Sequence, residues 1–317
     1  MTLIPPPLLT RRRWLAATTL TLAATAARAE RPLLRVGDQK GGLRALPEAA
    51  HELEGLAYDI KWAEFPAAAP LAEALNADAV DVGPIGDAPL LFALANGVRI
   101  KAIGVNRSDP YGTAVLVRPD SPLRTAADLQ GRHIATNRGS IGQLVALKAL
   151  ASAGLRPEPD TFRFLPPAES KLALTQGSVD AWATWEPYTA MAETAGHARV
   201  LASGRGLWSG LSFLAATDAA IAKQRPVLDD FLQRVVRAQR WSDGHVGEFS
   251  ATLARIIGIT PEAARLQFER RHQHWVPFDA QIAQDQQATA DFFLANGLMK
   301  QRLEVAPTFD TRFAPAG

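Results

Sequence analysis

The chain has 317 residues, of which 47% are hydrophobic and 21% are charged, and its formal net charge is +2. This length and composition suit one large or two ordinary globular domains and exclude a disordered chain. The sequence contains no cysteine, which excludes a disulfide framework, a thiolate metal site and a cysteine nucleophile. We expect no metal ion and no other cofactor.

The first 29 residues have the pattern of an export signal peptide. Arg11, Arg12 and Arg13 precede a short uncharged apolar run, and residues 27–29 read Ala-Arg-Ala, a small-x-small cleavage pattern. The run is too short to span a bilayer comfortably, which disfavours a membrane anchor. The same residues also suit the twin-arginine route, so both export routes stay open. Cleavage near Ala29 would remove four arginines and no acid, which changes the formal net charge from +2 to −2. The mature chain is then not basic, so we expect no nucleic-acid partner.

From Leu33 onwards, short apolar runs alternate with segments of helical spacing, which predicts two α/β lobes with largely parallel sheets. Strands are expected at 33–38, 57–65, 79–83, 99–105, 112–119, 132–136, 162–165, 179–184 and 198–202. Helices are expected at 41–53, 68–77, 88–97, 121–131, 140–153, 168–176 and 187–195. Beyond residue 219, apolar residues at i, i+3 and i+4 predict a helical tail with helices at 226–241, 246–257, 261–270 and 279–295.

The two predicted lobes share one plan. Ala74–Pro89 aligns without a gap with Ala173–Tyr188, and Gln39–Gly42 corresponds to Asn137–Ser140 at nearly the same offset along the chain. The near-constant offset favours duplication of one supersecondary unit over chance similarity.

Four strand-to-helix junctions point to one binding site. They lie at Gln39–Gly42, Gly86–Ala88, Asn137–Ser140 and Trp185–Tyr188. In open parallel sheets ligands bind beyond the carboxyl ends of the strands, where helix starts offer free N–H groups to an anion. For each junction alone, ordinary helix capping is the better interpretation, with Asp87 and Glu186 as caps. Four junctions facing one cleft favour an anion site, in which Trp185 would cover an apolar tail.

The chain resembles the periplasmic aliphatic-sulfonate-binding proteins, which are substrate-binding subunits of ABC importers close to the taurine and nitrate binders. The resemblance covers nearly all of residues 33–305 and rests on five stretches in order: LRVGDQKGG, WAEFPAAAPLAEALNADAVDVGPIGDAP, LVRPDSPLRTAADLQGRHIATNRGS, LPPAESKLALTQGSVDAWATWEPY and NGLMKQRLEV. It implies an α/β fold of the periplasmic-binding-protein type II, with a parallel-rich sheet flanked by helices in each lobe and two crossover strands between them. Lobe 1 would comprise residues 30–114 plus 216–317, and lobe 2 residues 115–215.

The resemblance also implies the pocket and the role. The implied ligand-binding residues are Gln39, Gly86, Asp87, Ala88, Gly139, Ser140, Trp185, Glu186 and Tyr188. The protein would be a periplasmic monomer without catalytic residues that captures an alkanesulfonate for an ABC permease in the inner membrane. Departures from the family pattern at Gly37–Gln39, Ile141–Gln143 and Ser209–Leu211 leave the tail of the ligand open.

Other ligands and other roles remain as alternatives. A sulfonate is a permanent monoanion that neutral donors can satisfy, and Lys40 or Arg138 could add a charged contact, although solvated surface is slightly favoured for both. Taurine, nitrate, a pyrimidine precursor, an aromatic sulfonate or a sulfate ester would suit the same role. A desulfinase of the same fold uses a cysteine, and the six histidines show no triad or zinc spacing. The polar segment 269–275 is interpreted as a solvated or partner-facing helix end.

Overall fold

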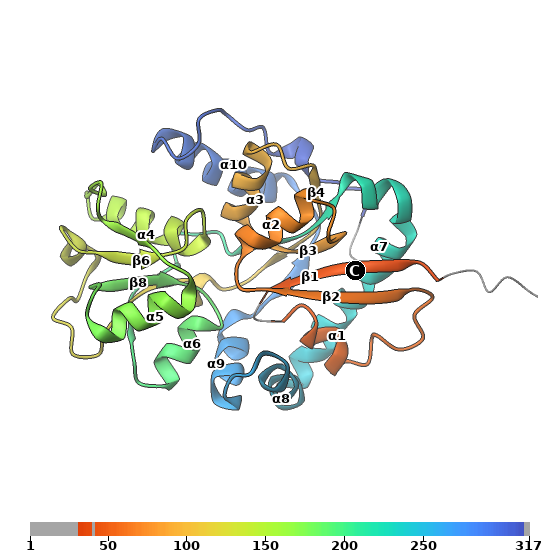
Figure 1. Ribbon diagram of the computed structural model, residues 1–317, viewed down its shortest axis with the longest axis horizontal. Helices are drawn as coiled ribbons and strands as arrows, with labels where there is room; N and C mark the ends of the chain where they lie inside the picture. Colours follow the sequence, from red (N-terminus) through yellow and green to blue (C-terminus); the bar gives the residue numbers. More distant parts are fainter. Residues whose placement is uncertain (1–30, 40–41, 314–317) are drawn as a thin grey trace, which may run out of the picture.

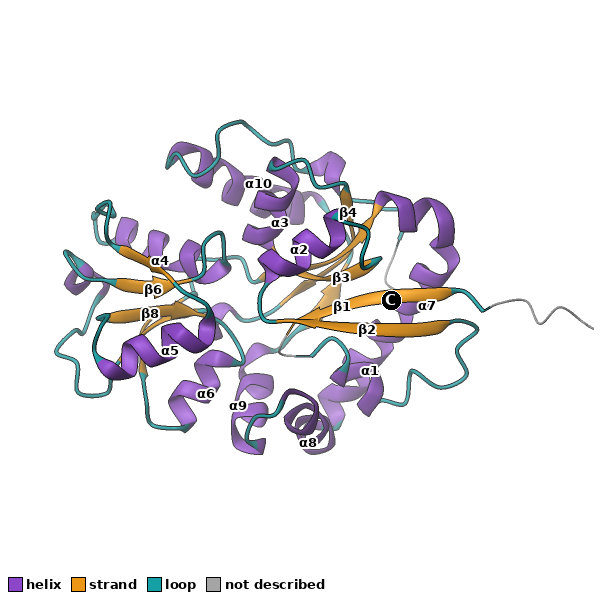
Figure 2. Ribbon diagram, in the orientation of Figure 1, coloured by secondary structure: helices purple, strands orange, loops and turns teal. Residues whose placement is uncertain are grey.

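Two β-sheets, each flanked by helices, organise the computed structural model (Figures 1 and 2). The structure describes residues 31–39 and 42–313, so the predicted signal peptide and Lys40 lie outside the described residues. The predicted two-lobe α/β class is confirmed. None of the helices in the described part of the chain is long and apolar enough to cross a membrane.

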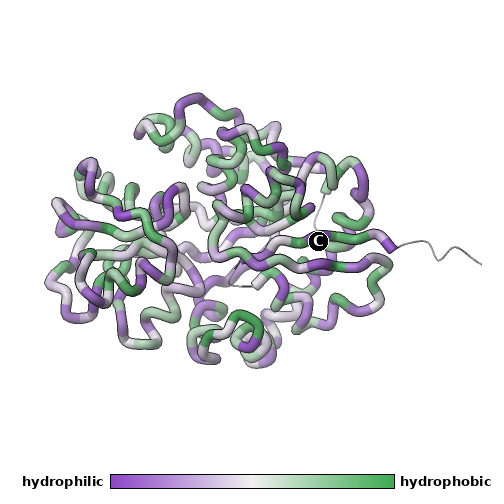
Figure 3. The backbone as a smooth tube through the Cα atoms, in the orientation of Figure 1, coloured by the Kyte–Doolittle hydropathy of each residue, from purple (hydrophilic) through white to green (hydrophobic). Residues whose placement is uncertain are grey.

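The first lobe is built on a six-stranded mixed sheet in the order β11-β4-β10-β3-β1-β2. Its strands are β1 (Leu33–Gln39), β2 (Asp59–Phe65), β3 (Val82–Gly86), β4 (Ile100–Arg107), β10 (Leu211–Thr217) and β11 (His274–Val276). Strand β1 runs parallel to β2 and β3, whereas β10 is antiparallel to β3 and β4 and β11 is antiparallel to β4. Hydrophilic and hydrophobic residues alternate along the edge strand β2 (Figure 3), as expected for a strand with one solvated face.

Seven helices belong to the first lobe in the described residues. They are α1 (Ala45–Ala49), α2 (Ala68–Asn76), α3 (Asp87–Ala95), α7 (Asp218–Gly244), α8 (Val246–Ile257), α9 (Pro261–Arg271) and α10 (Ala280–Ala295). In Figure 1, α2, α3 and α10 lie above the sheet and α1, α8 and α9 lie below it. Phe231, Leu232 and Val235 of α7 pack with Val36 and Ile103 of the sheet in one buried cluster. Full burial of each such side chain contributes roughly 1.5–3 kcal/mol.

The second lobe contains a five-stranded sheet in the order β7-β6-β8-β5-β9. Its strands are β5 (Ala114–Val117), β6 (Ile134–Thr136), β7 (Phe162–Phe164), β8 (Ala181–Thr184) and β9 (Arg199–Ser203), and its helices are α4 (Ile141–Ser152), α5 (Pro167–Gln176) and α6 (Tyr188–Thr194). Strand β6 is parallel to β7 and β8, and β5 is antiparallel to β8 and β9.

Polar residues fix where several helices begin. Ser140, Thr217, Thr260 and Asp279 each accept a hydrogen bond from the N–H three residues later, at distances of 3.1, 3.0, 3.2 and 2.8 Å. Each bond satisfies one of the backbone N–H groups that a helix start leaves free. These caps place α4, α9 and α10 within a few residues of the starts that the apolar spacing predicts. Helix α7 begins earlier than predicted, before a kink at Gln224.

Three predicted elements differ from the structure. The helix expected at 121–131 is only a 3-10 turn, Ala126–Leu129. A reciprocal capping box between Thr125 and Asp128 stabilises its N-terminal end. The helix expected at 41–53 is reduced to α1, Ala45–Ala49, and just beyond its C-terminal end His51 adopts a left-handed φ of 56°, which does not continue a helix. The strand expected at 79–83 lies later, as β3. Strands β10 and β11 were not predicted.

The pairing of two strands locates the crossovers between the lobes. The sequence assigned residues 211–215 to lobe 2, but β10 pairs with β3 and β4 of the first sheet. Strand β5, which begins at Ala114, pairs within the second sheet. We therefore propose that the chain crosses between lobes at residues 108–113 and 204–210.

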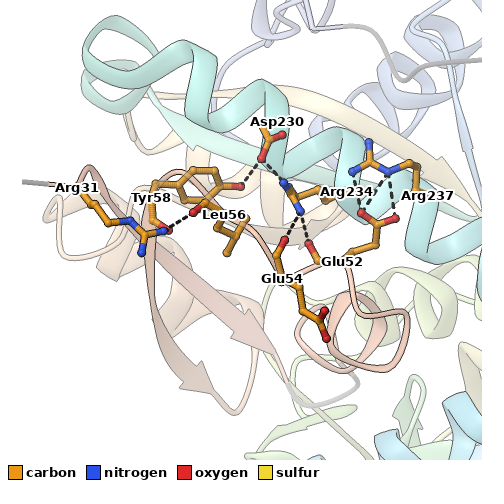
Figure 4. A network of polar contacts seen from close by, with 8 residues as sticks. All are labelled: Arg31, Glu52, Glu54, Leu56, Tyr58, Asp230, Arg234 and Arg237. Carbon is orange, nitrogen blue, oxygen red and sulfur yellow. Dashed lines mark hydrogen bonds and ion pairs between the residues drawn. The ribbon is translucent and has the colours of Figure 1, made fainter.

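A polar network ties the segment between α1 and β2 to α7 (Figure 4). Arg234 donates to the carbonyl oxygens of Glu52 and Glu54, at 2.7 and 3.1 Å, and to Asp230 at 2.7 Å. Asp230 also accepts from the hydroxyl of Tyr58 at 2.9 Å, and burial raises the pKa of that phenol. The network fixes the segment that follows α1 against α7, and both helices contribute to the cavity described below.

Candidate ligand-binding cleft

A cavity of about 480 Å³ lies where the two lobes meet. The second lobe contributes the start of α4 and the residues after β8, and the first lobe contributes the cleft edge of its sheet together with parts of α1, α2, α3, α7, α8 and α9. This volume is typical of pockets that bind small molecules, roughly 300–1,000 Å³.

A row of paired residues forms the edge of the first sheet in the cleft. Ser212 on β10 pairs with Gly86 on β3 and Asn106 on β4, and Asn106 pairs with Trp275 on β11. All four line the cavity. Within the described residues, Oδ1 of Asn106 and Nε1 of Trp275 are buried without a hydrogen-bond partner. Asn106, Ser212 and Trp275 could not be predicted as neighbours from the sequence, because strands β10 and β11, which bring them together, carry no recognised strand pattern.

The junction after β1 carries its own carboxylate. Asp38 accepts hydrogen bonds from the N–H groups of Gln39, Leu43 and Arg44 at 2.7, 2.9 and 3.0 Å. Burial raises the pKa of Asp38 to about 6. Gln39 lines the cavity, but its side-chain Nε2 already donates to the carbonyl oxygen of Pro84 at 2.6 Å.

The start of α3 is likewise occupied by a carboxylate. Asp87 is fully buried and accepts from Nε1 of Trp208 and the N–H of Ala88, both at 2.6 Å. Burial raises its pKa to about 7. The predicted capping role is wrong in detail, since Gly86 is the N-cap residue and Asp87 is the first helical residue. Gly86 lines the cavity, whereas Asp87 and Ala88 lie behind it.

The start of α6 has a third carboxylate. Glu186 accepts from the N–H of Ala190 at 3.0 Å and forms an ion pair with Arg270, which also bonds Glu193 at 2.6 Å. Burial raises the pKa of Glu186, and the guanidinium of Arg270 opposes that shift. Glu186 therefore accepts from the first turn of α6, although Pro187 and not Glu186 is the N-cap residue, and it also lines the cavity.

The two aromatic residues of this junction have different positions. Trp185 lines the cavity, and its ring meets that of Tyr188 edge to face at a centroid distance of 5.8 Å. The hydroxyl of Tyr188 donates to the carbonyl oxygen of Pro66 in the first lobe at 3.2 Å. Tyr188 thus bridges the lobes outside the cavity, while Trp185 faces into it.

The start of α4 differs from the other three. Ser140 caps it and donates to the carbonyl oxygen of Asn137 at 2.8 Å, and the N–H of Gly139 donates to Oε1 of Gln143 at 2.7 Å. No carboxylate of the described residues bonds to this helix start. Gly139 has a φ of +70°, and a Cβ atom there would lie 3.1 Å from Phe92 of the first lobe. Gly139 and Ser140 both line the cavity, so this junction faces the cleft as predicted.

Two arginines also line the cavity. Arg271, the last residue of α9, has no ion pair among the described residues, and burial lowers the pKa of its guanidinium. Arg138 is exposed, and its guanidinium lies 3.7 Å from the ring centroid of Phe164. The interpretation of segment 269–275 as a solvated or partner-facing helix end is therefore wrong for Arg271 and Trp275, which line the cavity, and for the partly buried Arg270, which is ion-paired with Glu186.

These contacts determine which parts of the cleft can bind an anion. Asp38, Asp87 and Glu186 each accept hydrogen bonds from N–H groups at one of the predicted junctions, so these donors are already occupied and are not available to a second anion. The start of α4 and the guanidinium of Arg271 keep their positive character. In the described part of the chain, no group of three or more His, Asp or Glu side chains is placed to hold a metal ion.

Comparison with known proteins agrees with this architecture. The model of the NMT1-like family matches residues 44–258. A relative from Escherichia coli (strain K12), described as an aliphatic sulfonates-binding protein, is 33% identical over 286 residues, which cover 89% of this chain and 90% of the relative.

Two solved structures are similar over the same extent. The alkanesulfonate-binding protein SsuA from Xanthomonas axonopodis pv. citri, bound to MOPS, is 35% identical, has a TM-score of 0.82 and covers 89% of this chain and 99% of its own. The periplasmic aliphatic sulphonate binding protein SsuA from Escherichia coli is 32% identical, has a TM-score of 0.79 and covers 89% and 98%. The chain therefore belongs to the NMT1-like family and is a homologue of the periplasmic aliphatic-sulfonate-binding proteins.

Proposed function

We propose that this protein binds aliphatic sulfonates in the cleft between its lobes, in the periplasm, and delivers them to the permease of an ABC importer. The observation that carries the proposal is the charge pattern of the cleft. Three junctions hold their own carboxyl groups, whereas the start of α4 and Arg271 line the same cavity and form no ion pair among the described residues.

The head group would be held from both lobes. Ser140 and the first N–H groups of α4 approach from the second lobe, and Arg271 and the amide of Asn106 approach from the first. A sulfonate has three acceptor oxygens and a permanent charge, so it can accept from neutral donors and from the guanidinium together. Because each lobe supplies part of the site, the ligand stabilises the closed arrangement of the lobes.

The residues named from the sequence then divide by role. Gln39, Gly86, Gly139, Ser140, Trp185 and Glu186 form walls of the site, with Trp185 covering the part of the ligand next to the head group. Asp87, Ala88 and Tyr188 support the walls from behind. We assign no catalytic residue, since the sequence offers neither a cysteine nucleophile nor a recognisable histidine-based triad. The protein would act as a monomer.

Isothermal titration calorimetry in a buffer free of sulfonates tests this function. The exported protein should bind hexanesulfonate at a single site, more tightly than taurine, nitrate or inorganic sulfate, and leave the ligand chemically unchanged. Binding of nitrate or taurine with no heat from any alkanesulfonate would refute the proposed ligand class.

A further inference from the structure

The cavity extends from the proposed head-group site into a side chamber below the first sheet. The chamber, which we name the α8–α9 chamber, is lined by residues of α1, α7, α8 and α9, and Figure 1 shows α1, α8 and α9 on that side of the sheet. Its apolar walls are Leu43, Leu46, Val235, Phe249, Leu253 and Phe268. An apolar chamber of this kind favours the hydrocarbon part of a ligand.

One polar side chain in this chamber has no partner for either of its polar atoms. Gln267 is 1% exposed, and both Nε2 and Oε1 are buried without a hydrogen bond among the described residues. Gln239 of α7 also lines the cavity, but its amide donates to Ser242 at 3.2 Å. Folded proteins leave few buried polar groups unpaired, because each one costs free energy. The chain itself therefore supplies no hydrogen-bond partner for the amide of Gln267.

The position of Gln267 relates it to the head-group site. It lies four residues before Arg271 on α9, hence on the same face of the helix one turn further from the cleft. Asn106 and Trp275, which also carry unpaired buried atoms, line the cavity beside it. A ligand whose head group meets Arg271 would reach Gln267 with its tail.

We propose that the α8–α9 chamber receives the tail of the sulfonate and that this tail carries an uncharged hydrogen-bonding group, such as an ether, hydroxyl or amide, that pairs with Gln267. This inference rests on the proposed function. A plain alkyl tail would leave both amide atoms unpaired, and an ionic tail would be stranded among apolar side chains. The ligand class is thus the functionalised alkanesulfonates.

A matched pair of ligands tests the role of Gln267. The probes are cyclohexylpropanesulfonate and its tetrahydropyranyl analogue, in which one ring oxygen replaces a methylene. The wild-type protein should bind the ether about tenfold more tightly, because a site built for a hydrogen bond rejects the analogue that lacks it. Gln267→Leu should abolish or reverse the preference, and the exposed control Gln301→Leu should keep it.

Equal binding of the two probes by the wild-type protein would overturn the proposal, because ordered water would then satisfy Gln267. A preference that survives in Gln267→Leu would overturn it as well. The wild-type comparison holds even if the variant fails to fold. If neither probe nor hexanesulfonate binds, the proposed function itself is wrong. If the sulfonates bind but the two probes bind equally, only the role of Gln267 is wrong.

A second variant tests where the tail lies. Leu43 is half-buried at the chamber wall, and Leu43→Trp would fill part of the space. It should weaken binding of cyclohexylpropanesulfonate at least about tenfold and leave ethanesulfonate binding within about twofold. Unchanged binding of the longer ligand, or equal loss of both, would contradict the location.

Discussion

At the scale of single residues, the proposed function assigns the main charged contact with the ligand to Arg271, which lines the cavity. Removal of its guanidinium in Arg271→Gln should weaken hexanesulfonate binding roughly ten- to hundredfold, the value of a charge-assisted hydrogen bond. Arg138 lines the same cavity but is exposed and stacked on Phe164, so Arg138→Gln is the matched control and should change affinity by no more than about twofold. Calorimetry on both variants decides the point, and equal losses would remove the special role of Arg271.

The buried carboxyl group of Asp87 gives stability a defined pH dependence. In the unfolded chain an aspartate ionises near pH 4, whereas burial raises the pKa of Asp87 in the folded protein to about 7. The folded state binds more protons over this range, so the contribution of Asp87 to stability falls as the pH rises from about 4 to about 7.

The variant Asp87→Asn should reduce this fall, because an amide oxygen can accept from Trp208 without ionising. Urea unfolding of variant and wild type at several pH values between 4 and 8 measures the difference. Burial also raises the pKa of Asp38, to about 6, so its contribution to stability falls with rising pH in the same way. Its effect requires a separate variant. An unchanged pH profile in Asp87→Asn would show that the pKa of Asp87 is the same in the folded and unfolded states, which would contradict the shift caused by burial.

At the scale of elements, the approach of α4 to α3 depends on a glycine. Gly139 and Gly131 both have positive φ, +70° and +66°, but only Gly139 has an atom of the other lobe near its missing Cβ. Alanine at either position should cost about 1–2 kcal/mol of stability through backbone strain. Only Gly139→Ala should also weaken sulfonate binding, because contact with Phe92 would push the lobes apart. Denaturant unfolding and calorimetry separate the two effects, and equal affinities in the two variants would contradict this reading.

The same scale shows what the sequence could predict. Period-two and period-3.6 patterns identified most strands and helices, and the glycine-rich junctions were correctly placed between strands and helices. Strand β11 is three residues long within a polar stretch, which is too short for a pattern, and it carries Trp275 into the cleft. The burial of Asp87 depends on Trp208, which is 121 residues away. Contacts at such separations leave no local signal, so the free guanidinium of Arg271 was not predicted either.

At the scale of the whole molecule, one ion-pair cluster links the lobes independently of ligand. Arg270 on α9 of the first lobe bonds Glu186 and Glu193 of the second. Arg270→Leu should cost about 3–5 kcal/mol, because the buried carboxylate of Glu186 would lose its ion-pair partner. The double variant Arg270→Leu with Glu186→Gln should recover part of the lost stability. Denaturant unfolding of the wild-type protein, the single variant and the double variant measures this recovery. A double variant no more stable than Arg270→Leu would show that the unpaired carboxylate is not the cause.

The central claim is that a sulfonate head group is held between the lobes by the start of α4 and by Arg271. A crystal structure of the protein with hexanesulfonate tests it most directly, since sulfur gives the head group a clear peak in the density. We predict sulfonate oxygens within hydrogen-bonding distance of the Arg271 guanidinium and of the first N–H groups of α4. A head group located against Asp87 at the start of α3, or outside the cleft, would contradict the account.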